Sequence, residues 1–183
     1  MTTKTKYSKL DLGTIEAVFN KLGGVDGAQR FLRGDVEVVV RKHIIDCDAD
    51  PFCPDDWKVV EHKKGGQLEW NSDNVQLFLA EGQKEGRYIE GNQLRKELEG
   101  QSVLNANVLD YLLDHQELIP ESWKGRYVFF WDTIYRRRSG GDLCVRALCF
   151  RGRRWDWRYD WLDRVFGDDD PAACLASVKE LCS

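Results

Sequence analysis

Apolar and polar residues alternate along the last third of the chain in a way that predicts three antiparallel strands. The pattern covers residues 126–136, 143–150 and 154–161. Successive side chains of a strand point to opposite faces of a sheet, so such alternation is typical of strands. The intervening segments 139–142 and 151–153 contain glycine and suit tight turns. The sequence therefore predicts a C-terminal β meander.

The third predicted strand separates large aromatic side chains from charged ones. One face holds Trp155, Trp157, Tyr159 and Trp161, and the other alternates arginine with aspartate. Rings on one face of a meander normally cover a hydrophobic interior, and the sequence favours this interpretation. The alternative is an exposed platform on which nucleic-acid bases stack. The first strand, which is apolar on both faces, is expected to be central.

The preceding residues mix helical and strand patterns. Apolar residues at helical spacing predict two short helices before residue 34 and two more at 91–98 and 105–113. β-Branched residues predict a strand at 36–45, and alternation predicts another at 74–80, where a short helix capped by Ser72 would also fit. Segments 57–60 and 67–70 flank a glycine-containing turn and are expected to form a hairpin.

The end of the chain carries a helix signal. Pro171 follows three aspartates, which suits a first helical position behind an acidic cap, with Leu175, Val178 and Leu181 pointing inward. The predicted fold class is therefore α+β: an antiparallel sheet with short helices packed on it and a C-terminal three-stranded meander. A change of pattern near Pro120 suggests a mixed, acidic region at 1–120 and an arginine-rich and aromatic region at 121–183. One continuous domain is the alternative.

Charge is distributed unevenly. The formal net charge of the 183 residues is −4, which argues against a uniformly basic nucleic-acid binder. Residues 124–164 nevertheless hold eleven basic and five acidic side chains. The acidic remainder can dock on this basic segment, or the basic surface can be left free for a ligand.

The positive charge without an obvious partner lies at the predicted turns. Arginine and aspartate on the third strand can neutralise each other, whereas the turns carry Arg136, Arg137, Arg138, Arg151 and Arg153. Arginine forks suit phosphate and carboxylate groups, so we expect these residues to contact a phosphate or an acidic partner. An RNA or single-stranded DNA binder would add Trp155, Trp157 and Tyr159 as stacking rings.

An acidic loop is the one candidate metal site. Asp46, Asp48 and Asp50 alternate after a predicted strand, and carboxylate oxygens suit Ca²⁺ or Mg²⁺. The pattern departs from a helix–loop–helix calcium loop, because Pro51 replaces the turn glycine and Trp57 replaces the bidentate glutamate. A metal-dependent hydrolase or nuclease is therefore an alternative function, and a solvated acidic loop is the favoured interpretation.

Other chemistry leaves no signature in the sequence. The six cysteines form no C-x-x-C pair, the three histidines lie in different elements, and no glycine pair matches a phosphate-binding loop. No cofactor is predicted beyond a possible divalent cation, and no residue is predicted to be catalytic. The expected function is a non-catalytic binding module for another protein or for nucleic acid. No apolar run reaches membrane-span length and the N-terminus has no apolar signal segment, so a cytoplasmic location is expected.

Several stretches of the chain resemble a family of uncharacterised bacterial proteins. They are Asn20–Gly24 (NKLGG), Glu61–Gly66 (EHKKGG), Val103–Leu113 (VLNANVLDYLL), Phe129–Arg136 (FFWDTIYR) and the Trp161-Leu162-Asp163 step in an aromatic C-terminal part. The resemblance covers nearly the whole chain and implies a bacterial cytoplasmic protein. It implies no activity, and no functional residue is carried over from it.

Overall fold

Two compact units make up the chain, one spanning Met1–Arg41 and the other Lys42–Ser183. The computed structural model describes residues 11–37, 39 and 41–176. The division falls between Arg41 and Lys42 rather than near Pro120. Strands from both sides of Pro120 pair in one sheet, so residues 42–176 share a common framework.

The first unit contains two helices joined by a left-handed turn. The Asp11 carboxylate accepts a hydrogen bond from the Thr14 amide at 2.6 Å and caps the first helix. Gly23 and Gly24 have φ angles of 93° and 74°, which the absence of a Cβ permits. Within the two helices only Ala28 is buried, and most apolar side chains are exposed. The helices are α1 (Leu12–Lys21) and α2 (Gly24–Leu32).

The second unit is built on a six-stranded sheet with the order β4-β10-β6-β7-β8, in which β2 also pairs with β6. The predicted meander is confirmed as three antiparallel strands, and β6 is central because β2, β7 and β10 all pair with it. The sheet strands are β2 (Trp57–His62), β4 (Val75–Phe78), β6 (Tyr127–Arg137), β7 (Leu143–Arg151), β8 (Arg154–Trp161) and β10 (Ala172–Leu175).

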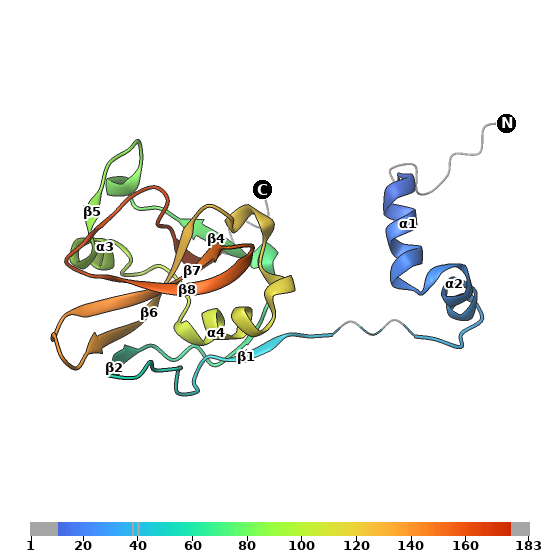
Figure 1. Ribbon diagram of the computed structural model, residues 1–183, viewed down its shortest axis with the longest axis horizontal. Helices are drawn as coiled ribbons and strands as arrows, with labels where there is room; N and C mark the ends of the chain where they lie inside the picture. Colours follow the sequence, from blue (N-terminus) through green and yellow to red (C-terminus); the bar gives the residue numbers. More distant parts are fainter. Residues whose placement is uncertain (1–10, 38, 40, 177–183) are drawn as a thin grey trace. The chain divides into compact units, whose positions relative to one another are not determined.

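Helices and two small ribbons surround this sheet (Figure 1). Strand β1 pairs with β3, and β5 pairs with β9. These elements are β1 (Ile44–Asp46), β3 (Gln67–Glu69), β5 (Ile89–Glu90), β9 (Val165–Phe166), α3 (Gly91–Glu97) and α4 (Ala106–Asp114). Short 3-10 turns are η1 (Ser72–Asn74), η2 (Glu81–Gln83), η3 (Gln116–Leu118) and η4 (Glu121–Trp123).

Both faces of the sheet are covered, which confirms an α+β fold with helices packed on antiparallel strands. On one face, Val108, Leu109 and Leu112 of α4 pack against Phe130 and Leu148. On the other face, α3 and β9 contribute a second apolar cluster that includes Phe129, Ile134, Val145, Leu94 and Phe166. A strand buried on both faces reads as a nearly continuous apolar run, which explains the composition of β6.

Strand β6 is irregular at its middle. Phe129 lies opposite Ala147 and Ile134 lies opposite Val145, so four residues of β6 face Arg146 alone. A bulge of this kind bends a strand and redirects its side chains. The bend allows β10 to pair with the first part of β6 and β2 to pair with the last part. A space lies beside residues 131 and 132 in this irregular part of the strand.

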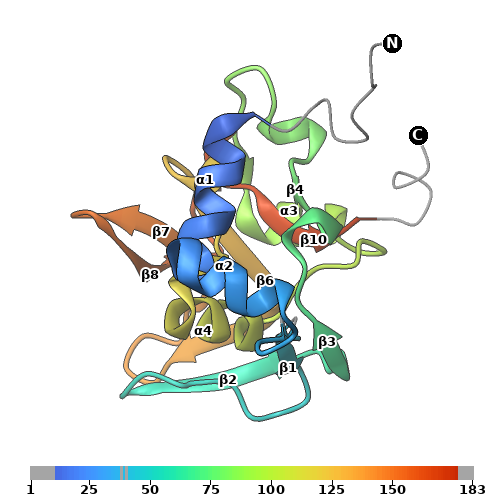
Figure 2. The ribbon, with the colours of Figure 1, turned by 90° about the vertical axis from the view of Figure 1, so that its right-hand side faces the viewer.

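The prediction of a helix from Pro171 onward is wrong. Residues 172–175 form β10, which lies beside β4 and runs parallel to β6 (Figure 2). Ala173 enters one core cluster while Ala172 and Cys174 enter the other. Small side chains fit between two packed faces, so tertiary burial overrides the helix propensity of alanine. The expected inward positions Val178 and Leu181 lie outside the described residues.

Two further expectations upstream are wrong. Strands β2 and β3 do not pair as a hairpin, because β2 joins β6 while β3 joins β1. The Lys63 amide donates to the Asp132 carbonyl at 2.8 Å, which keeps this segment along β6 past the end of β2. The strand expected at 36–45 is limited to Ile44–Asp46 among the described residues. Val39, for example, is exposed and is not part of a strand.

Candidate functional site

A groove lined by basic side chains lies where the end of β6 meets β2. Lys58 and Arg136 are opposite each other in the β2–β6 pair. Together with Arg137, Arg138 and Gly141 they line a cavity of about 340 Å³, and no acidic residue contributes to its lining. The structure thus adds Lys58 to the three arginines that the sequence singles out at this turn. We call Lys58 and Arg136–Arg138 the cationic groove.

The positive charges of the cationic groove are not neutralised, and one of them, Arg138, is held in place by hydrogen bonds. Arg138 donates its Nε–H to the Trp57 carbonyl at 3.3 Å and its amide to the Asp56 carbonyl at 2.7 Å. Within the described part of the chain, none of the four side chains forms an ion pair. The Nε of Arg136 is buried and has no acceptor among the same residues. Such a set of donors is suited to an anion that brings its own acceptor oxygens.

The other predicted arginines lie at the opposite end of the meander. Arg151 ends β7 and Arg153 lies in the turn between β7 and β8, whereas the cationic groove sits near the turn between β6 and β7. Strand β7 has nine residues, so the two ends are about 30 Å apart at strand rise. Gly152 and Arg153 both have positive φ angles, 57° and 71°, as a tight two-residue hairpin turn requires. The structure therefore splits the predicted arginine set into two separate groups.

The aromatic face of β8 is mainly an internal surface. Trp155 is 6% exposed and packs against Phe150 with ring centroids 5.2 Å apart. Trp157, Tyr159 and Trp161 are half-buried and contact the ring of Trp57, which β2 contributes. The structure thus puts Trp155 in the core and leaves only partly exposed rings toward the end of the strand.

The charged face of β8 is largely neutralised within the strand. Arg158 lies 3.4 Å from Asp160, and Arg154 lies 3.9 Å from Asp156. The same aspartates also accept backbone amides, Trp157 N–H at 2.8 Å and Trp161 N–H at 3.1 Å. Strand β8 is at the edge of the sheet, where free amides invite pairing with another chain. The aspartates therefore protect this edge.

A hollow of about 480 Å³ opens beside the last residues of β8. It is lined by Tyr159 and Trp161 together with Arg158, Asp160, Arg164 and Val165. Trp161 and Tyr135 both lie opposite Cys144, so this hollow belongs to the same end of the sheet as the cationic groove. Two strand spacings separate β8 from β6, which is about 10 Å.

The acidic loop holds itself together through its own carboxylates. Asp46 accepts the Asp48 amide at 3.0 Å, and Asp48 accepts the Gly66 amide at 2.8 Å. Asn107 donates to the Asp46 and Ala49 carbonyls from α4 and ties the loop to the core. Across residues 11–37, 39 and 41–176, no group of three or more His, Cys, Asp or Glu side chains could hold a metal ion. The Asp46 carboxylate thus bonds to a backbone amide of the loop, and the Asp48 carboxylate bonds to a backbone amide of the segment at Gly66.

A buried ion pair, which the sequence interpretation missed, lies under the aromatic face. Arg146 is 1% exposed and forms two hydrogen bonds with Asp110 of α4, at 2.7 and 3.1 Å. Its guanidinium lies 4.6 Å from the ring of Trp157 and 5.1 Å from that of Phe52. Burial lowers the pKa of Arg146, but the Asp110 carboxylate more than compensates and raises it above its ordinary value. A single arginine inside the apolar run of β7 was the signal for this pair.

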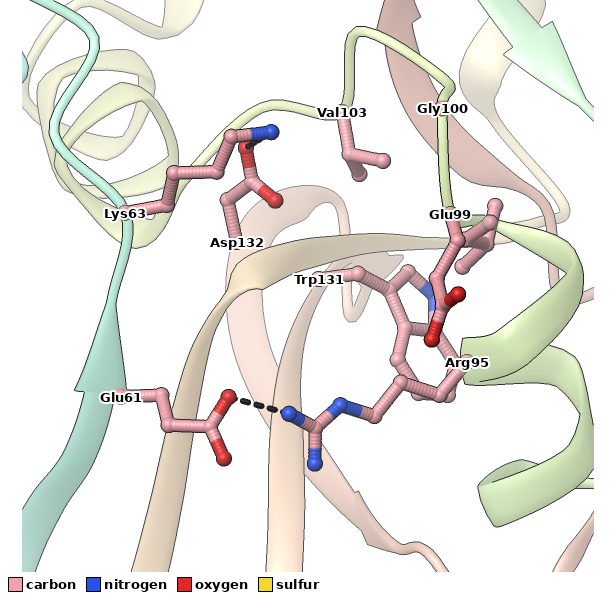
Figure 3. A pocket seen from close by; sticks show the side chains of 9 residues that line it. Glu61, Lys63, Arg95, Glu99, Gly100, Val103, Trp131 and Asp132 are labelled. Atoms are coloured by element: carbon pink, nitrogen blue, oxygen red, sulfur yellow. Dashed lines mark hydrogen bonds and ion pairs between the residues drawn. The ribbon is translucent and has the colours of Figure 1, made fainter.

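A second pocket, of about 320 Å³, opens at the bulge of β6 (Figure 3). Its apolar part consists of Leu98, Val103 and Trp131, all buried. Its rim carries three acids and two bases, namely Glu61, Glu99, Asp132, Lys63 and Arg95.

The rim charges of this second pocket are arranged in pairs. Arg95 forms an ion pair with Glu61, and Lys63 lies 3.4 Å from Asp132. Figure 3 shows these two pairs apart from each other, while the Trp131 ring and Glu99 overlap in this view. Burial raises the pKa of Asp132 against the opposing pull of the Lys63 ammonium. The result is a concave site with both signs of charge around an apolar base.

The framework around the second pocket is tied by hydrogen bonds from distant segments. Thr133 Oγ1 accepts the Ala106 amide at 3.0 Å and bonds to His62 Nδ1 at 2.9 Å. Asn105 donates to the carbonyls of Cys47 and Lys63. Three of the stretches behind the family resemblance, 61–66, 103–113 and 129–136, thus meet at this point.

Comparison with known proteins returns no match to a family model, to a curated protein or to a solved structure. The resemblance to a bacterial family therefore stays a prediction. In the stretch of chain described, none of the helices has both the length and the apolar character that are needed to cross a membrane.

Proposed function

We propose that this protein is a non-catalytic binding module that holds single-stranded nucleic acid by its phosphate groups at the cationic groove. The observation that carries the proposal is the gathering of Lys58 and Arg136–Arg138 in one cavity without any acidic lining residue. Phosphate contacts supply most of the sequence-independent affinity of nucleic-acid binders. The net negative charge of the chain does not oppose this, because the contact depends on the local field.

The half-buried rings at the same end of the sheet favour a nucleic acid over an acidic peptide. Tyr159 and Trp161 line the hollow beside β8 together with Arg158 and Arg164. Lys58 and Arg136 lie on the opposite face of the sheet from these rings, so a nucleic-acid strand that passes from the groove around this end of the sheet would bring bases to them, and a stacked base contributes about 1–3 kcal/mol. An acidic peptide would use the cations but would gain nothing comparable from the aromatic side chains. Trp155, which is buried, has no part in this interface.

A binding titration with matched arginine variants tests the proposal. Fluorescence anisotropy is measured with a labelled uridine oligonucleotide about twelve nucleotides long, within the usual site sizes. Arg137→Gln with Arg138→Gln is expected to weaken binding about tenfold at low salt. The control is Arg151→Gln with Arg153→Asn, which removes the same charge at the opposite end of the meander and is expected to leave affinity unchanged.

Three results would refute the proposal. They are no saturable binding by the parent protein at low salt, equal losses in the two double variants, and tighter binding of a polyglutamate peptide than of the oligonucleotide. Thermal unfolding of both variants is recorded alongside, because all four arginines are exposed and their loss should leave the fold intact.

A further inference from the structure

The pocket at the bulge of β6 contains a hydrogen-bond donor that the protein leaves unused. Trp131 is 5% exposed, and its Nε1 is buried without an acceptor among the described residues. Figure 3 shows the indole nitrogen on the side of the ring that faces Glu99. A buried N–H without a partner is unfavourable, so a ligand that supplies an acceptor here gains the free energy of that hydrogen bond.

The charge pattern of the rim narrows the ligand class. Three carboxylates oppose a simple anion, which would meet Glu61, Glu99 and Asp132. A simple cation would meet Lys63 and Arg95 and would still leave the indole N–H unsatisfied. A zwitterion, which carries a carboxylate and an ammonium close together, suits both the acids and the bases of the rim. Its carboxylate accepts hydrogen bonds from the donors, and its ammonium faces an acid.

The base of the pocket and its size narrow the class further. Buried side chains of Leu98, Val103 and Trp131 form an apolar surface that suits an aliphatic or aromatic group. The volume of about 320 Å³ is large enough for a single amino acid.

We propose that this pocket binds a free α-amino acid with an apolar side chain. The carboxylate of the ligand accepts from Trp131 Nε1 and faces Arg95. Its ammonium faces Glu99, which has no ion-pair partner in the described part of the chain. Its side chain packs on Leu98 and Val103. The proposal is independent of the cationic groove, which shares none of these residues.

The indole resonance of Trp131 provides a direct test. The protein is labelled with ¹⁵N at tryptophan indoles, and the Trp131→Phe variant identifies the signal by its loss. L-leucine, L-valine and L-phenylalanine are titrated separately. At least one is expected to shift the Trp131 signal saturably with a Kd at or below about 1 mM, a typical metabolite range. If none shifts it up to about 10 mM, which is well above that range, the proposal is refuted.

Two comparisons test the zwitterion requirement. For L-leucine the partial ligands are 4-methylpentanoate, which lacks the amine, and 3-methylbutylamine, which lacks the carboxylate, with the corresponding pairs for the other amino acids. Each is expected to bind at least about tenfold more weakly than the amino acid, the cost of one charged hydrogen bond. A partial ligand that binds as tightly as the amino acid would overturn the proposal.

A matched pair of variants tests the role of Glu99. Glu99→Gln is expected to weaken amino-acid binding about tenfold, because the ammonium loses its counter-charge. Glu97→Gln removes an exposed acid two residues earlier, at the end of α3, that does not line the pocket, and it is expected to have no effect. Equal affinities of the two variants would refute the assignment.

Discussion

The two turns of the C-terminal meander look alike in sequence but differ in structure. Arg136–Arg138 and Arg151–Arg153 both place arginines beside glycine at a strand end. At the first turn, β2 runs alongside β6 and brings Lys58 into a shared cavity. At the second, the chain reverses within two residues, and Arg151 faces Arg154 across the hairpin. Exposed charge becomes a candidate site only where a second segment makes the surface concave.

The strand between these turns, β7, contains an arginine in a third environment, the core. Arg146 lies in the middle of β7 and is buried against Asp110 and the rings of Trp157 and Phe52. Burying a charge is costly unless another charge and hydrogen bonds compensate, and α4 supplies that compensation. The same residue type thus serves a groove, a solvated turn and the core, depending on what tertiary structure places beside it.

The largest expected effect is the loss of the partner of Arg146. Asp110→Ala leaves a buried guanidinium without its counter-charge and is expected to reduce the free energy of unfolding by about 3–5 kcal/mol. Denaturant unfolding followed by tryptophan fluorescence measures the change. The double variant Asp110→Leu with Arg146→Met should recover most of the loss, since an apolar pair of similar volume avoids the burial of charge. If the double variant is as unstable as Asp110→Ala, the ion pair is not the cause.

The fold was predictable from the sequence where a pattern depends on near neighbours. The strands expected at 126–136, 143–150 and 154–161 agree with β6, β7 and β8 to within one residue at each end, because alternation and turn glycines are local signals. Strand β10 was missed because Ala172–Leu175 is held by β4 and β6, both distant in sequence. Its short alanine-rich segment favours a helix until two packed faces surround it.

The candidate sites were only partly predictable for the same reason. Charge and composition identified Arg136–Arg138, but not that Lys58 faces them, because the expected hairpin assigned β2 to another partner. The pocket beside Trp131 depends on a bulge in β6, and a bulge leaves no distinct mark in an apolar strand. The rings of β8 were expected to be internal, and Trp155 is buried in the structure, whereas Trp161 stays partly exposed.

The second expected effect concerns how salt weakens the binding of single strands at the first turn. Each phosphate contact on a single strand contributes about −0.7 to the slope of log K against log salt. The slope for Arg137→Gln with Arg138→Gln should therefore be shallower by about 1.4 than that of the parent protein. Arg151→Gln with Arg153→Asn should keep the parent slope. Anisotropy titrations across a range of salt concentrations measure these slopes. If the parent protein and both double variants have the same slope, the arginines of the first turn contact no more phosphates than those of the second.

The smallest expected effect isolates the backbone of the second turn. Arg153 has a φ angle of 71°, a left-handed conformation that a side chain makes unfavourable. Arg153→Gly relieves this strain and is expected to raise the free energy of unfolding by about 0.4–1 kcal/mol, part of which the more flexible unfolded chain offsets. Arg138→Gly is the matched change at the first turn, where φ is not positive, and it should give no gain because the chain loses the hydrogen bond to the Trp57 carbonyl. Calorimetric unfolding of the two variants measures the difference. If Arg153→Gly is no more stable than Arg138→Gly, the left-handed conformation of Arg153 does not destabilise the protein.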